Sequence, residues 1–212
     1  MNATGRHILT TALSLLGFAI VGAVLLAGTN DMTRPSIEKS ERDAKIRLIA
    51  QVLPAGSYDN DLVKSARPLP ADPLLGLRQP AEYYPATLAG KTTAVVLEAI
   101  APDGYAGEIK LLVGIRPDGV LTGVRVTAQS ETPGLGDYID AAKSNWIHNF
   151  DGKSLDNPTP DGWKVKKDGG KFDYMAGATI SPRAVVKAVK KALEYFAQHK
   201  AELLPQEVQH GQ

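Results

Sequence analysis

The stretch TTAVVLEAIAPDGYAGEIKLLVGIRPDGVLTGVRVTAQ, residues 92–129, decides the fold. It contains three segments rich in β-branched residues, and turn signals separate them, as expected for consecutive strands. Arg116-Pro117-Asp118-Gly119 favours a tight turn between the second and third segments, because proline presets φ and glycine accepts the permissive end of the turn. The stretch therefore predicts a largely antiparallel sheet.

A helix is predicted near the C-terminus, where Ser181-Pro182 is expected to cap and open it. Apolar residues then recur at helical spacing and predict one buried stripe. The stripe comprises Val185, Ala188, Val189, Ala192, Leu193 and Phe196. Together with the sheet, this helix predicts an α+β domain over residues 91–200, followed by a C-terminal tail over residues 201–212.

Two further elements are expected between the sheet and the last helix. Asp137 is placed to cap a helix with one apolar face. The residues expected on that face are Ile139, Ala142, Trp146 and Phe150. Residues 163–174 indicate a hairpin, because Asp168-Gly169-Gly170 stands in their middle.

The N-terminal segment ILTTALSLLGFAIVGAVLLA, residues 8–27, contains no charged residue. At about 1.5 Å per residue, such a helix covers roughly 30 Å, the thickness of the hydrocarbon layer of a membrane. A cleaved secretory signal is the alternative, but its apolar core is shorter, about 7 to 15 residues. We therefore predict an uncleaved transmembrane helix over residues 8–28, with residues 1–7 in the cytoplasm and the globular part exported.

Residues 29–90 connect the predicted span to the sheet. Within residues 36–53, apolar positions form one stripe among charged positions and indicate an amphipathic helix. The stripe comprises Ile37, Ala44, Leu48, Ile49 and Val52. Prolines recur from Pro54 to Pro85, so we expect an irregular segment wrapped on the domain surface, with at most short strands.

Composition excludes several classes of function. The 24 basic and 23 acidic residues nearly cancel, so nothing indicates a nucleic-acid partner. The chain has no cysteine, which excludes thiolate-held iron–sulfur clusters, cysteine-attached haem and disulfides. Its histidines, His7, His148, His199 and His210, are scattered and predict no metal site. Any redox role must therefore use another cofactor.

Two short stretches could carry chemistry. In the loop from Ser130 to Gly136, glycines would let backbone amides face a ligand closely, although an ordinary turn between a strand and a helix is the simpler interpretation. Thr179 stands just before the last helix, where free N–H groups and the helix dipole favour a phosphate. Helix capping by Thr179 or Ser181 is the simpler interpretation there.

Taken together, ETPGLG at 131–136 and DYMAGAT at 173–179 resemble the paired signatures of FMN-binding domains. That family's pattern is an Asp, two variable residues, Ser or Thr, and then Gly-Ala-Thr, so Ala176 departs from it at one position. The resemblance covers essentially the whole chain. Its anchor, length and AGATISP ending look most similar to the anchored subunits of Rnf-type ion-translocating electron transport complexes. The related, longer subunits of sodium-pumping quinone reductases are the alternative.

The resemblance implies a covalently bound cofactor, because the final threonine of the pattern carries FMN through a phosphoester bond in that family. This residue is Thr179 here. Threonine is a poor nucleophile near neutral pH and no histidine is close in sequence, so self-modification is not expected. The resemblance implies instead a flavin transferase that uses FAD and Mg²⁺, recognises Asp173 and releases AMP.

The implied role is an electron carrier without a catalytic acid or base of its own, working with other membrane subunits of the complex. We expect Gly177 and Ala178 beside the phosphate. Beside the isoalloxazine we expect Glu131, Thr132, Leu135 and Gly136. The implied location is the bacterial inner membrane, with the globular domain on the periplasmic side. A cofactor-free anchored scaffold remains the rival interpretation, and a hydrolase using Thr179 or Ser181 lacks an evident base.

Overall fold

The computed structural model describes residues 3–204, and their side chains except those of 3–12, 14, 27–38 and 41. The chain divides into two units, residues 1–44 and residues 45–212. Helix α1 (Ala3–Ala50) makes up the first unit and contributes its last turns to the second. Within the part of the chain so described, no helix combines the length and the hydrophobicity needed to cross a membrane. Within the predicted span 8–28, the side chains of residues 8–12, 14, 27 and 28 are outside the described part of the structure, and so is the predicted tail beyond residue 204.

The second unit is built on a five-stranded antiparallel sheet in which each strand pairs with the next along the chain. The strands are β1 (Arg67–Leu69), β2 (Ala81–Leu88), β3 (Lys91–Ala101), β4 (Ile109–Ile115) and β5 (Leu121–Ala128). The turn at Arg116 to Gly119 joins β4 and β5, and Gly119 has a φ of 84° there. The three strands predicted between residues 92 and 129, and the α+β class, are confirmed.

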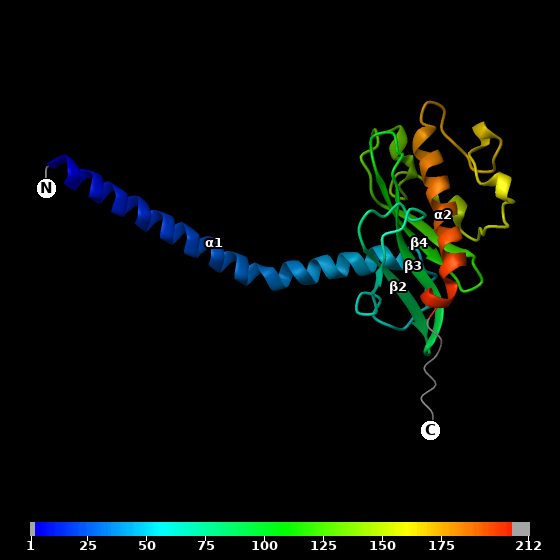
Figure 1. Cartoon of the computed structure of the whole chain (residues 1–212), viewed down its shortest axis with the longest axis horizontal. Helices are drawn as coiled ribbons and strands as arrows, with labels where there is room; N and C mark the ends of the chain where they lie inside the picture. The colour runs from blue at the N-terminus through cyan, green and yellow to red at the C-terminus, as the bar shows by residue number, and fades with distance from the viewer. Residues whose placement is uncertain (1–2, 205–212) are drawn as a thin grey trace, which may run out of the picture. The chain divides into compact units, whose positions relative to one another are not determined.

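Alternation along β3 gives the sheet two buried faces. Val95 and Leu97 pack in a core with helix α2 (Ile180–Leu203), which lies along the sheet as Figure 1 shows. Val96 lies on the opposite face, in a second core with Ile49 from the end of α1. All six residues of the apolar stripe predicted for the last helix are buried, so that prediction is confirmed.

The proline-rich segment contains more strand than expected, because β2 runs for eight residues through Pro85. Strand β1 faces only residues 81–83 of β2, so its pairing ends before Pro85. Asn60 reaches this free edge, where its Nδ2 donates to the Pro85 carbonyl at 2.9 Å and its Oδ1 accepts from the Thr87 N–H at 2.8 Å. An edge position needs no N–H from residue 85, and this is where a strand tolerates proline.

The prediction of an α-helix that begins at Asp137 is wrong. Two short 3₁₀ helices replace it, η1 (Gly136–Ile139) and η2 (Trp146–Phe150), and Ala142 between them is exposed. Asp137 lies inside η1, where its buried carboxylate accepts from the Gly134 N–H at 2.8 Å. Ile139, Trp146 and Phe150 are buried as their spacing predicted, but aromatic packing, and not a run of α-helical hydrogen bonds, holds this segment in place.

The prediction of a hairpin over residues 163–174 is also wrong. The segment contains η4 (Lys166–Asp168), and η3 (Pro160–Gly162) precedes it. Its one bridge, between Val165 and Phe172, is parallel. Phe172 stacks on Phe150 with ring centroids 4.7 Å apart and lies 5.1 Å from Trp163. This aromatic cluster draws both ends of the segment onto the core and overrides the turn preference of the two glycines.

Candidate functional site

Residues 175–178 form a tight turn directly before α2. The Ala178 N–H donates to the Met175 carbonyl at 3.1 Å, and Gly177 occupies the turn with a φ of 87°. Residues with a Cβ rarely adopt this φ, so the turn requires glycine at 177. A Cβ on Gly177 would meet open space, so the requirement comes from the backbone and not from crowding.

Thr179 follows this turn and occupies the N-cap position of α2. Its side chain makes no capping hydrogen bond, and the residue is half-buried. The expectation that Ser181-Pro182 caps the helix is wrong, because Ser181 is the second residue inside it and its hydroxyl points elsewhere. Among the described residues, the Thr179 hydroxyl therefore caps no helix N–H group, at a position where helices usually use a side-chain oxygen for this purpose.

The hydroxyl of Ser181 donates instead to Oε2 of Glu131 at 2.5 Å. The other carboxylate oxygen of Glu131 accepts from the Ala106 N–H at 3.2 Å. Both Glu131 and Ser181 are buried. One carboxylate therefore ties together the loop after β5, the loop before β4 and the first turn of α2, which directly follows the second sequence motif.

Gly136 and Gly104 make room for this carboxylate. A Cβ on Gly136 would lie 2.8 Å from Oε2 of Glu131, and one on Gly104 would lie 2.8 Å from Oε1. Both distances are shorter than side-chain contacts allow, so a larger residue at either position would displace this carboxylate. Of the predicted site residues, Glu131 and Gly136 are therefore buried where the loop packs against the domain.

Thr132 and Leu135 lie on the exposed side of the same loop. The Thr132 carbonyl accepts from the N–H groups of Leu135 and Gly136, each at 3.1 Å, and this bonding turns the loop outward. Leu135 is 47% exposed, and Met175 and Ile180, on either side of Thr179 in sequence, are 40% and 44% exposed. Exposed apolar side chains therefore occur on both motifs.

Tyr138 supports the turn before Thr179, and sequence patterns did not single it out. Its hydroxyl accepts from the Met175 N–H at 3.1 Å and donates to the Ala178 carbonyl at 3.3 Å. Burial raises the pKa of the Tyr138 phenol, while the Met175 N–H opposes that shift. The phenol therefore stays protonated near neutral pH and can make both bonds.

Asp173 stands at the beginning of this segment with its carboxylate exposed. It forms an ion pair with Lys166, and its backbone carbonyl accepts from Trp146 Nε1 at 2.7 Å. The side chain predicted for enzyme recognition is thus at the surface, while the backbone beneath it is fixed to the core.

The residues around Thr179 fit a phosphoester. Its hydroxyl is not used for capping, and within the described chain no acceptor pairs with the N–H groups of Ile180 and Ser181 at the start of α2. Free N–H groups and the positive end of the helix dipole favour a phosphate at this place. No group of three or more metal-binding side chains occurs among the described residues.

Comparisons with known proteins identify the family of the chain. Residues 104–194 match the FMN-binding domain, and residues 1–52 match the RnfG N-terminal region. A protein from Pseudomonas aeruginosa, named as the G subunit of the ion-translocating oxidoreductase complex, is 53% identical over 205 residues, which cover 97% of this chain and 96% of the relative. Proteins of the same name from Vibrio cholerae and Shewanella baltica are 48% and 47% identical and cover 90% and 88% of this chain, and 91% and 88% of their own lengths. The chain belongs to the RnfG family of ion-translocating oxidoreductase complex subunits and contains an FMN-binding domain.

Proposed function

We propose that the chain is the flavoprotein subunit of an Rnf-type ion-translocating electron transport complex and carries electrons on an FMN attached covalently to Thr179. The observation that supports this most is the position of Thr179, whose hydroxyl makes no capping hydrogen bond although it stands at the N-cap of α2. The match of residues 104–194 to the FMN-binding domain supplies the identity of the cofactor.

The phosphate of the flavin would lie at the start of α2, with the N–H groups of Ile180 and Ser181 as donors. Gly177 and Ala178 would form the adjoining turn, which Tyr138 holds in place. Thr132 and Leu135 would face the isoalloxazine from the neighbouring loop, and Glu131 and Gly136 would hold that loop from within. When bound, FMN supplies reversible uptake and release of electrons, while the chain sets its position and surroundings.

We infer that a separate enzyme makes the attachment, because a threonine hydroxyl is a poor nucleophile near neutral pH and needs a base to activate it. The reaction we propose uses FAD and Mg²⁺ on a flavin transferase. The Thr179 oxygen forms a bond to the FMN phosphorus, the bond joining the two phosphates of FAD breaks, the hydroxyl proton is lost and AMP leaves. Asp173, exposed six residues before Thr179, is available for recognition by that enzyme.

We further propose that residues 8–28 anchor the chain in the bacterial inner membrane, with the FMN-binding domain on the periplasmic side. The support is an uncharged segment in a continuous helix, with large apolar side chains exposed where they are described, such as Phe18 at 78% and Leu26 at 73%. Two results would support this arrangement. The chain should stay in the pellet after alkaline carbonate washing, and protease should cleave the domain in cells whose outer membrane has been opened while the inner membrane is intact. Release by carbonate contradicts the anchor.

The decisive experiment is denaturing gel electrophoresis of the full chain under ultraviolet light. Flavin fluorescence that survives denaturation is expected, together with its loss in Thr179→Ala. A dark band from cells that contain the transferase contradicts the proposed function and leaves the cofactor-free scaffold. The alternative assignment to a sodium-pumping quinone reductase is disfavoured by the RnfG N-terminal match over residues 1–52.

A further inference from the structure

Residues 164–171, with the sequence KVKKDGGK, form a loop that we call the basic loop. It contains four lysines and one aspartate, and all four lysines are exposed. Val165 within it is fully buried, as are Trp163 and Phe172 at its two ends to within a few per cent. The apolar residues therefore anchor the loop in the core, and the lysines project from that anchor into solvent.

Backbone contacts hold the basic loop in one conformation. The Lys166 N–H donates to the Phe172 carbonyl at 2.7 Å, and the Phe172 N–H donates to the Lys164 carbonyl at 3.1 Å. A Cβ on Gly170 would collide with the Lys164 backbone, so the two arms of the loop approach as closely as the chain allows. The lysines are thus fixed at their Cα atoms, and little backbone entropy would be lost when a partner binds them.

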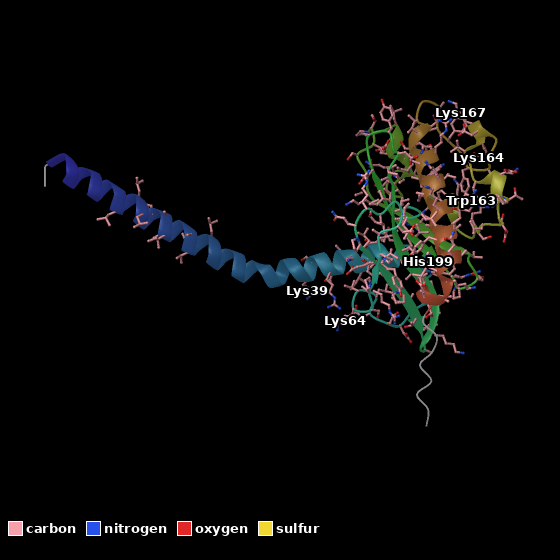
Figure 2. The ribbon with its side chains drawn as sticks, viewed as in Figure 1. Lys39, Lys64, Trp163, Lys164, Lys167 and His199 are labelled. Carbon is pink, nitrogen blue, oxygen red and sulfur yellow. The ribbon has the colours of Figure 1, made fainter. Side chains whose placement is uncertain are left out.

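Two ion pairs join the basic loop to the proposed flavin site. Lys166 pairs with Asp173, which begins the segment leading to Thr179. Asp168 accepts two hydrogen bonds from Arg183, in the first turns of α2, at 2.5 and 2.6 Å. Figure 2 shows Lys164 and Lys167 on the segment beside the N-terminal end of α2.

These ion pairs use the nearby carboxylates and leave an excess of positive charge. Among the described residues, no carboxylate lies within ion-pair distance of Lys164, Lys167 or Lys171. The pKa of Asp168 is lowered chiefly by the hydrogen bond from Arg183 and also by the charges of Lys167 and Lys164, as expected where cations gather. The basic loop therefore presents Lys164, Lys167 and Lys171 as exposed cations beside the proposed flavin site.

Apolar side chains border this charge. Tyr174 and Met175 follow the basic loop in sequence, and each is 40% exposed. Exposed apolar side chains next to charged ones are typical of protein interfaces, in which complementary charges steer the encounter and fix the orientation. We propose that the basic loop, with Tyr174 and Met175, docks on an acidic surface of the protein that exchanges electrons with the flavin.

This proposal rests on the proposed function, because only a flavin on Thr179 requires a redox partner at this end of the domain. The same requirement favours a protein over a membrane surface, since lipid headgroups accept no electrons. Lysines are flexible point charges and suit transient contacts with carboxylates, whereas fixed bidentate recognition would favour arginine. The contact is expected to weaken with salt, because exposed charges are screened beyond about 10 Å at 0.1 M ionic strength.

Zero-length carbodiimide cross-linking of the intact complex in membranes tests the proposal, because this reagent joins a lysine amine to a carboxylate in contact with it. Lys171 serves as the reporter amine in every variant. The variant Lys164→Glu/Lys167→Glu reverses the charge of the patch, Lys164→Arg/Lys167→Arg preserves it, and Lys91→Glu/Lys200→Glu makes the same charge change elsewhere. The ion pair between Lys187 and Asp103, at 2.5 Å, provides an intramolecular cross-link that controls for reagent activity.

We expect mass spectrometry to find Lys171 cross-linked to an Asp or Glu of another chain of the complex that carries a redox cofactor; a cross-link only to chains without one overturns the proposal. The yield of the expected cross-link should fall at least about fivefold in the Glu variant and in about 1 M salt, and should be unchanged in the Arg variant and the distant control. Absence of any intermolecular Lys171 cross-link, or equal yield in the Glu variant, overturns the proposal.

Two parallel measurements separate the remaining outcomes. In the full chain anchored in vesicles, protection of Lys171 from amine acetylation by phosphatidylglycerol but not phosphatidylcholine, lost in the Glu variant and kept in the distant control, assigns the patch to a membrane surface and also overturns the proposal. In-gel flavin fluorescence is recorded for every variant. Absence of flavin fluorescence from the chain without substitutions refutes the proposed function. Flavin-loaded protein without the Lys171 cross-link refutes only the docking surface.

Discussion

Ser181 and Glu131 are fifty residues apart in sequence and share a buried hydrogen bond of 2.5 Å. This bond joins the loop after β5, which contains the first motif, to the first turn of α2, which follows the second motif. Since Thr179 stands two residues before Ser181, its position also depends on this contact. The site is therefore held by a residue pair outside the attachment residue itself.

Removing one partner of this bond should destabilise the fold. Ser181→Ala leaves a buried carboxylate oxygen without its donor, which costs about 1–3 kcal/mol in the free energy of unfolding. Glu131→Gln should cost a similar amount, and the double variant less than the two together, with a coupling of about 1–2 kcal/mol. Urea unfolding of the full chain in detergent measures all four proteins.

Ser130→Ala is the matched control, because Ser130 is exposed on the same loop. Its effect should stay within about 0.5 kcal/mol. Strict additivity of Ser181→Ala and Glu131→Gln would mean that the two side chains do not stabilise each other.

Thr179→Ala should abolish covalent flavin with little loss of stability. Replacing an N-cap threonine usually costs about 1 kcal/mol, but the Thr179 side chain makes no capping hydrogen bond, so a smaller change is expected. Thr179→Ser retains a hydroxyl and should keep some flavin. Intact-mass spectrometry reports attachment, and thermal unfolding reports stability. Flavin still bound to the Ala variant after denaturation would place the attachment at another residue.

Gly177→Ala should impair attachment by straining the turn. The φ of 87° at this position costs a residue with a Cβ about 1–2 kcal/mol, although the Cβ itself would meet open space. Ala176→Ser changes the neighbouring, exposed residue of the same turn and should leave stability and flavin content unchanged. Unchanged flavin content in Gly177→Ala would show that the turn tolerates another conformation.

Patterns with a local period could be predicted from the sequence. The β-branched segments gave β3, β4 and β5, and the stripe that contains Val185 and Val189 gave α2, because hydrophobic periodicity depends only on neighbours along the chain. The eight-residue β2 was missed because Pro85 argued against it, and only the short reach of β1 explains why proline is tolerated there.

Contacts between distant residues could not be predicted in this way. Trp146 and Phe150 have helical spacing, yet their rings pack edge to face at 5.5 Å within a short 3₁₀ helix. Capping rules favoured Ser181, but a carboxylate from another loop takes its hydroxyl. Tyr138 has no local signal at all, because its role depends on a turn 37 residues away.

Tyr138→Phe should destabilise the turn before Thr179 in a pH-dependent manner. The variant loses the acceptor for the Met175 N–H, at a cost of about 1–2 kcal/mol near neutral pH. Burial raises the folded-state pKa of this phenol above its unfolded value of about 10, so the stabilisation is fully present below pH 10 and is lost as the pH rises through the folded pKa. The difference in free energy of unfolding between the original chain and Tyr138→Phe should therefore become smaller above pH 10.

Urea unfolding at several values between about pH 8 and pH 11 measures this difference. Tyr84 and Tyr195 also have raised pKa values, chiefly through burial, so the stability of every variant should decline at high pH. Tyr84→Phe therefore serves as the reference, because Tyr84 lies on the other face of the sheet and its hydroxyl bonds to Glu98 at 2.6 Å. Flavin content should fall in Tyr138→Phe and stay unchanged in Tyr84→Phe, since only Tyr138 holds the turn that presents Thr179. A difference that is constant across this pH range would mean that the Tyr138 phenol titrates alike in the folded and unfolded chain.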